Sequence, residues 1–316
     1  MKKQIMLLAC MLMVSIAMFG GTNNKILLHH EGNVKIFNTD QLTDALNASV
    51  DGDTIFLPQG TFKGFDITKK ITVRGVGVKT ILNSAVRIAV AGTPTFTSPV
   101  LESVQITGSF NVSQACKNLQ LKKCRLTGGF SVSAKSEDIV LDRCYSGGST
   151  FTLSSSLISM NVINSYIYQL NNNNGNEYNA TFVNCVIGNR RSGNSQTYIN
   201  CIIDNCYYSD NMNNSIFTNC LYNTSINGNY NSYIGSSCTL QNCYAVENEG
   251  LLEDISKENL LTNKYLGNDG TIVGPYGGAS PYDPEMLPAA PRVESSSVKL
   301  DIDNKKLNVT LKVTAQ

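Results

Sequence analysis

The strongest constraint on this chain is a short motif that recurs about every twenty residues. An apolar stretch leads to Asn or another polar residue, then usually to Cys, then to a second apolar stretch. Aligned copies place Val104, Cys124, Cys144, Ser165, Cys185, Cys201, Cys220 and Cys243 at one position, with spacings of 20, 20, 21, 20, 16, 19 and 23 residues. A unit of this size buries its apolar side only against its neighbours, which predicts a solenoid.

One copy shows how each unit folds. Phe130–Ser133 and Ile139–Asp142 alternate apolar and polar residues at the period of a strand, and Cys144–Ser146 is a third short strand. Polar residues and glycines mark the bends between them. Three strands and three bends make a triangular coil, and stacked coils pair equivalent strands in parallel about 4.8 Å apart. The chain is therefore predicted to be all-β.

Stacking also places like side chains above one another. The six repeat cysteines are expected to form an inward ladder, with Val104 and Ser165 as variants of it. Asparagine suits a tight bend because it tolerates left-handed backbone and its amide bonds backbone groups or the Asn of the next coil. A second ladder is therefore predicted at Asn164, Asn184, Asn200, Asn219 and Asn242.

These ladders resemble those of the right-handed parallel β-helix family, the pectate-lyase-like solenoids, which carry an asparagine ladder at a short turn. The likeness covers roughly residues 50 to 280. Asp51–Phe62 and Lys70–Gly77 look like the first coil and a half of such helices, and Asp269–Gly278 is similar to their closing segment. The resemblance implies a single-stranded right-handed parallel β-helix. It implies no one activity, because this fold hosts lyases, hydrolases, adhesins and proteins without catalysis.

The two ends of the repeat have characters of their own. Asp40–Ala48 is expected to form a short capping helix with Asp40 as its N-cap. The pair His29 and His30 is expected in an N-terminal strand. Residues 22–280 are predicted to form the β-helix itself. Residues 281–316 are predicted to be a linker, up to Pro291, followed by a C-terminal β-hairpin that docks along the solenoid, on its side or over its last coil; the less favoured alternative is a partner-binding tail.

The first 21 residues read as a secretory signal peptide. A basic start, Met1–Lys3, precedes the apolar run Ile5–Phe19, which is too short to span a bilayer. We therefore expect an exported protein, in the periplasm, on the cell surface or outside the cell, with no transmembrane segment. The less favoured alternative is a lipid anchor on Cys10, which ends a lipobox-like sequence.

The charge balance argues against a nucleic-acid partner, and the cysteine spacing argues against disulfides between coils. Lys and Arg number 25 against 24 Asp and Glu, which argues against nucleic-acid binding. In-register cysteines on neighbouring coils keep their Cβ atoms near 4.8 Å, above the roughly 3.8 Å that a disulfide prefers, so buried thiols are expected. No metal site is predicted, and pairing among Cys116, Cys206 and Cys238 stays open.

The candidate site comes from the segments that follow the ladder positions, which grow longer in the middle of the chain. In the resembling family, such loops and the outer face of the next strand build the substrate groove. Tyrosine can stack on sugars, Arg can pair with uronate carboxylates, and ordinary solvated turns are the alternative interpretation. The candidate binding residues are Arg190, Arg191, Asp204, Tyr207, Tyr208 and Asp210.

Acidic residues are scarce in this region. Between Ser146 and Tyr244 they are Glu177, Asp204 and Asp210, too few for the carboxylate clusters of related lyases and hydrolases. The sequence therefore favours a non-catalytic protein that contacts polysaccharide or is structural, without a cofactor. One alternative is a polysaccharide lyase acting on acidic glycans, with Ca²⁺ as cofactor; another is an adhesin or spacer.

Overall fold

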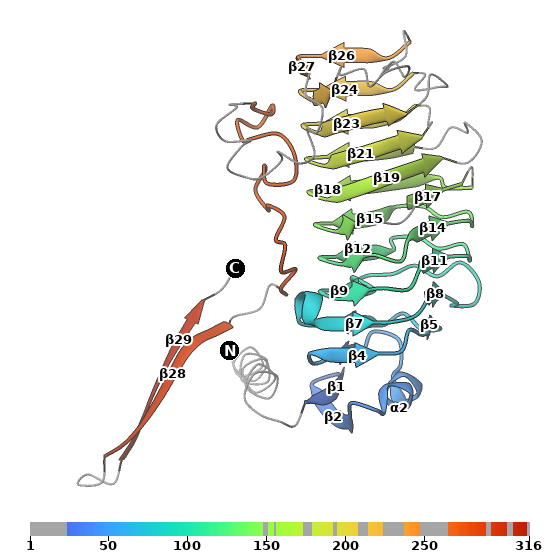
Figure 1. Ribbon diagram of the computed structural model, residues 1–316. Helices are drawn as coiled ribbons and strands as arrows, with labels where there is room; N and C mark the ends of the chain where they lie inside the picture. The colour runs from blue at the N-terminus through green and yellow to red at the C-terminus, as the bar shows by residue number, and fades with distance from the viewer. Residues whose placement is uncertain are drawn as a thin grey trace.

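The computed structural model describes residues 24–147, 151–154, 156–172, 179–191, 195–207, 214–223, 237–246, 265–288, 292–301 and 306–314. These residues form a β-solenoid of about eight turns, with parallel sheets running along the stack (Figure 1). The predicted all-β parallel β-helix with one short helix is thereby confirmed.

The first sheet, sheet A, has one strand in each coil. Its strands are parallel except at its start, where β1 pairs antiparallel with both β2 and β3. In spatial order the 12-stranded sheet contains β2 (Asn33–Asn38), β1 (Lys25–His30), β3 (Thr54–Phe56), β6 (Thr72–Arg74), β9 (Leu101–Glu102), β12 (Gln120–Lys122), β15 (Ile139–Asp142), β18 (Ser159–Ile163), β20 (Asn179–Val183), β22 (Thr197–Ile199), β24 (Ile216–Thr218) and β26 (Thr239–Gln241).

The second sheet, sheet B, forms the other two walls of the coils. The second wall contains β4 (Gly60–Phe62), β7 (Thr80–Leu82), β10 (Gln105–Ile106), β13 (Arg125–Leu126), β16 (Tyr145–Ser146), β19 (Tyr166–Asn172), β21 (Val186–Arg191), β23 (Ile202–Tyr207), β25 (Leu221–Asn223) and β27 (Tyr244–Val246). The third wall contains β5 (Asp66–Ile67), β8 (Val86–Ile88), β11 (Phe110–Val112), β14 (Phe130–Val132) and β17 (Phe151–Leu153). The long strand β19 pairs with both β16 and β17, so the two walls merge there.

The core is built from inward ladders. Phe110, Phe130 and Phe151 stack ring on ring along the third wall, and Phe182, Tyr198 and Phe217 do so along sheet A. Beside them lies the cysteine ladder, whose members from Cys124 to Cys220 are buried. Identical side chains meet because equivalent residues of successive coils pair in register.

The ladder cysteines are thiols, as predicted. Each of them, like Cys116, is unbridged. Their S–H groups donate to backbone carbonyls; Cys201, for example, lies 3.2 Å from Ile199 O and 3.3 Å from Phe182 O. Burial raises the pKa of Cys144, Cys201 and Cys220 above the usual value of 9.0, so these thiols stay protonated. The side chain of Cys206 lies outside the described part of the structure.

The bend between sheet A and the second wall uses left-handed backbone in every described coil from β9 upward. The φ angles lie between 46° and 55°, and the residues are Ser103, Lys123, Arg143, Asn164, Asn184, Asn200, Asn219 and Asn242. The predicted asparagine ladder is therefore confirmed for the upper coils. Asn is among the few residue types that adopt this conformation at low cost.

The N-terminal end of the core is covered by helix α2 (Leu42–Ala48), which buries Leu42 and Ala45. Its N-cap is Gln41 and makes no side-chain cap bond, so the prediction of Asp40 was wrong. The Lys69 ammonium donates to the carbonyls of Leu46, Asn47 and Ser49 at 2.6–2.9 Å, which satisfies the end of the helix.

Residues 265–288, here called the strap, return down one side of the stack. Figure 1 shows them beside the solenoid from the level of the upper coils to that of β7 and β9. Gly274 N donates to Asn200 O at 2.8 Å in the upper part, and Lys123 Nζ donates to Leu287 O at 2.7 Å in the lower part. Met286 is 0% exposed. The described part of the predicted linker is therefore packed on the solenoid.

The asparagine ladder holds the strap. Asn164 Nδ2 donates to Gly277 O at 2.7 Å and to Pro275 O at 3.1 Å. Asn200 and Asn268 exchange two bonds, from Asn200 Nδ2 to Asn268 Oδ1 at 2.9 Å and from Asn268 N to Asn200 Oδ1 at 3.0 Å. The sequence predicted backbone groups and the next Asn of the ladder as partners; here both amides bond the strap.

We expect Asn164→Ala to lower the free energy of unfolding by about 2–3 kcal/mol. The change removes two buried hydrogen bonds, worth about 1 kcal/mol each, and puts Ala in left-handed backbone at a cost of about 1 kcal/mol. Asn164→Gly keeps the conformation free and should cost about 1 kcal/mol less than the Ala variant. Urea titration of both variants measures the difference. Equal free energies of unfolding for the Ala and Gly variants would contradict the cost assigned to left-handed backbone.

The C-terminal hairpin forms, but not where it was expected. Strands β28 (Arg292–Asp301) and β29 (Lys306–Thr314) pair antiparallel, with Asp301 opposite Lys306 at the turn end. In Figure 1 the hairpin extends away from the stack, so the predicted docking along the solenoid is not seen. Sequence alternation predicts the two strands but carries no information on where the hairpin lies relative to the solenoid.

Candidate functional site

The predicted site residues lie in strands rather than in loops. Arg190 and Arg191 end β21, and Asp204 and Tyr207 belong to the neighbouring β23. The expectation that these candidate residues lie in loops is therefore wrong for the four of them that are described, because the walls merge and the strands continue through the bend. Tyr208 and Asp210 lie outside the described residues.

The pairing register places the two arginines differently. Arg190 follows Leu170 in the column that begins with the buried rings of Phe110, Phe130 and Phe151. Arg191 pairs with Asn171 and Tyr207, in the column of Asn111, Ser131 and Thr152. In the lower coils the second column is the outward one, where the Ser131 hydroxyl donates to Asn111 Oδ1 at 2.8 Å. The backbones of Arg190 and Arg191 therefore belong to different columns of the wall.

Two tyrosines that the prediction missed lie on the outer side of the second wall, next to Asp204. Tyr168 is 41% exposed, and Tyr166 and Asp204 are half-buried. Ile187 pairs with both Ile167 and Ile203, so Tyr168 and Asp204 flank Gly188 on the strands either side. Burial, with Tyr145, Asp204 and Tyr168 nearby, raises the pKa of Tyr166 to about 12. Tyr166, Tyr168 and Asp204, with Arg191 and Tyr207 in register beyond the bend, are here called the β19–β23 surface.

A stack of side chains leads up to this surface from the coils below. The Arg125 guanidinium lies 4.5 Å from the Tyr145 ring centroid, and the Tyr145 and Tyr166 rings stack at 5.0 Å. Stacked rings direct their faces along the solenoid axis, so neighbours occupy those faces and the ring edges point outward. The faces of the Tyr145 ring are therefore occupied by Arg125 and Tyr166. Tyr168 is the tyrosine here with a large exposed area.

The strap borders the same surface. Outward residues of the second wall become apolar above Tyr166, and Val186, Ile202 and Leu221 form a small core with Ile272 and Val273 of the strap. Tyr276 packs against this cluster, and burial raises the pKa of Tyr276 and Tyr282. The strap thus covers the apolar part of the second wall and leaves Tyr168 exposed.

The acidic side chains of the described coils are mostly paired. Glu102 meets Arg74 at 2.8 Å, and Asp142 meets Arg143 at 2.6 Å. Within the described ranges, no three His, Cys, Asp or Glu side chains come together as a metal site would need. The described side chains of the β19–β23 surface are the Tyr166 and Tyr168 hydroxyls and the Asp204 carboxylate.

Comparison with known proteins adds no assignment. Neither a family model, a curated protein nor a solved structure matches this chain. No helix in the described part of the chain is long and apolar enough to cross a membrane.

Proposed function

We propose that this chain is an exported, pectate-lyase-like β-helix that contacts polysaccharide through the β19–β23 surface without catalysing a reaction. The observation that carries the proposal is the lengthening of β19, β21 and β23, which brings Tyr168, Asp204 and Arg191 onto three adjacent strands. Consecutive rungs of a rigid stack present such groups in a row, which suits an extended chain of sugars.

The chemistry of the surface favours a glycan that carries carboxylates. Tyrosine and carboxylate oxygens bond sugar hydroxyls, and arginine binds a uronate carboxylate with two parallel bonds. Asp204 is the described acid of this surface, and Arg191 lies on the adjacent strand β21, beyond the bend. A polysaccharide lyase remains the second candidate, because a basic and an acidic residue on adjacent strands are the minimum from which proton abstraction could be built.

The test is binding of the purified protein to polygalacturonate, alginate and neutral xylan, followed by calorimetry with and without Ca²⁺. We expect the acidic polymers to bind, and Tyr168→Ala and Arg191→Ala each to weaken binding about tenfold, which corresponds to about 1.4 kcal/mol. Ile216→Ala removes a similarly exposed, outward side chain from sheet A, the other wall of the coil, and should leave binding unchanged.

The same samples decide between binding and cleavage. Unsaturated uronate products, seen by their ultraviolet absorbance and abolished in Arg191→Ala, would replace the binding proposal by a lyase. Failure of all three polymers to bind would contradict a glycan-contacting function and leave the adhesin or spacer.

A further inference from the structure

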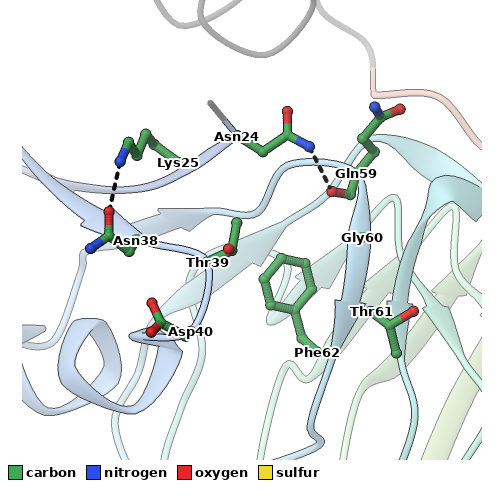
Figure 2. Close-up of a pocket in the computed structure, with 9 residues that line it drawn as sticks. All are labelled: Asn24, Lys25, Asn38, Thr39, Asp40, Gln59, Gly60, Thr61 and Phe62. Carbon is green, nitrogen blue, oxygen red and sulfur yellow. Dashed lines mark hydrogen bonds between the residues drawn. The ribbon is translucent and has the colours of Figure 1, made fainter. Parts of the chain in front are cut away.

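A separate hollow lies at the N-terminal end of the stack, far along the solenoid from the β19–β23 surface. It has a volume of about 630 Å³ and opens between the β1–β2 hairpin and strand β4. Figure 2 shows Thr39 and Asp40 on one side, Thr61 on the other and the Phe62 ring between them. The size lies within the range of small-molecule sites.

The fold leaves this place open because sheet B starts here. Among the described strands, β4 pairs with β7 alone, so Gly60, Thr61 and Phe62 form the edge of the sheet there. The β1–β2 hairpin continues sheet A instead, and α2 covers the core. A free edge carries backbone N–H and C=O groups that have no strand partner. At three residues, β4 is short for pairing with an added strand.

The side chains of the hollow are polar around one aromatic ring. Lys25 Nζ donates to Asn38 Oδ1 at 2.6 Å, and Asn24 Nδ2 donates to Gln59 O at 3.3 Å, so two walls are held in place. Among the described lining residues, Asp40 is the one anion and Lys25 the one cation. Phe62 is 5% exposed and forms the floor.

This lining fits one class of ligand better than others. A phosphate or nucleotide would need more cations, a divalent cation more carboxylates, and a lipid a larger apolar wall. A sugar ring has hydroxyl groups around its rim and an apolar C–H face, which match the amide, hydroxyl and carboxylate groups around Phe62. We propose that the hollow binds one neutral sugar residue, free or at the end of a glycan, independently of the β19–β23 surface.

Saturation-transfer NMR of the purified protein with D-glucose, D-galactose, D-mannose and N-acetylglucosamine tests this. We expect transfer to at least one of them, with Asp40→Ala weakening its binding about tenfold, the usual effect of losing hydrogen bonds to a charged group. Asp44→Ala is the matched control, because Asp44 is an exposed acid of α2 that does not line the hollow. Disaccharides ending in the sugar that binds separate a free ligand from a chain end.

The outcomes also separate this site from the first one. Tyr168→Ala should keep monosaccharide binding, and Asp40→Ala should keep polymer binding. Transfer to none of the sugars, or equal binding by Asp40→Ala and Asp44→Ala, would overturn the proposal. Free amino acids belong in the same panel; if they bind and no sugar does, Lys25 and Asp40 recognise a zwitterion and the sugar assignment is wrong.

Discussion

Phe217→Ala is expected to lower the free energy of unfolding by about 3–5 kcal/mol, the usual cost of emptying a fully buried aromatic site. Phe217 is 0% exposed, and its ring stacks on Tyr198 with centroids 4.8 Å apart. Tyr198 also stacks on Phe182 at 4.9 Å, so the substitution would leave the Tyr198 ring with a stacking partner on one face instead of two. The midpoint of urea unfolding, followed by circular dichroism, measures the loss.

The matched control is the preceding residue of the same strand. Ile216 points outward and is 43% exposed, so Ile216→Ala should change the free energy of unfolding by about 0.5 kcal/mol or less. The contrast between neighbours tests the inward and outward alternation of β24. Similar losses in both variants would mean that the strand does not alternate as described.

The solenoid could be predicted from the sequence because its determinants are local and repeated. Each coil places Cys124, Cys144 or Cys185 at the same point, and each upper coil turns on an asparagine with positive φ. Pattern and conformation agree at every repeat, so a single copy explains the rest. The aromatic stacks follow from the same register.

The strap could not be predicted from its own residues, because 265–288 has no period. The sequence evidence for the strap lies instead in the strands that the strap covers. The pairs Val186-Ile187 and Ile202-Ile203 are apolar on both sides of the strand, as in sheets that are buried on both faces. Tyr145 and Tyr166 occupy the same register position as Val186 in lower coils. These outward tyrosines mark where the apolar surface covered by the strap ends.

The candidate residues Arg190, Arg191, Asp204 and Tyr207 were expected in loops, but they lie in strands. Asn189, Arg190 and Asn205 have low strand propensity and suggest a loop. In the solenoid, Gln169 pairs with Asn189 and Asn189 with Asn205, so the backbone bonds of neighbouring coils override that propensity. The hollow beside β4 was missed because it depends on where sheet B starts, which no single repeat reveals.

The free energy of unfolding should also fall steeply above about pH 9. Cys144, Cys201 and Cys220 have raised pKa values in the folded protein because burial disfavours the thiolate, whereas the unfolded chain releases these protons near the usual value of 9.0. Above that value the unfolded state binds fewer protons than the folded state, so the free energy of unfolding decreases as pH rises. Each thiol contributes about 1.4 kcal/mol per pH unit, or about 4 kcal/mol per unit for the three together.

Urea unfolding from neutral pH to about pH 10 measures this slope, and the ladder itself supplies the control substitution. Val104 occupies the cysteine position one coil below Cys124, so Cys201→Val keeps an apolar side chain of a type the ladder already holds. The variant has one titrating thiol fewer and should lose about 1.4 kcal/mol per pH unit of the alkaline slope, whatever its stability at neutral pH. Tyr166, with its pKa raised to about 12, adds a decline of the same sign that begins only above about pH 10. An unchanged slope in Cys201→Val would assign the alkaline loss to tyrosines and contradict the role of the thiol ladder.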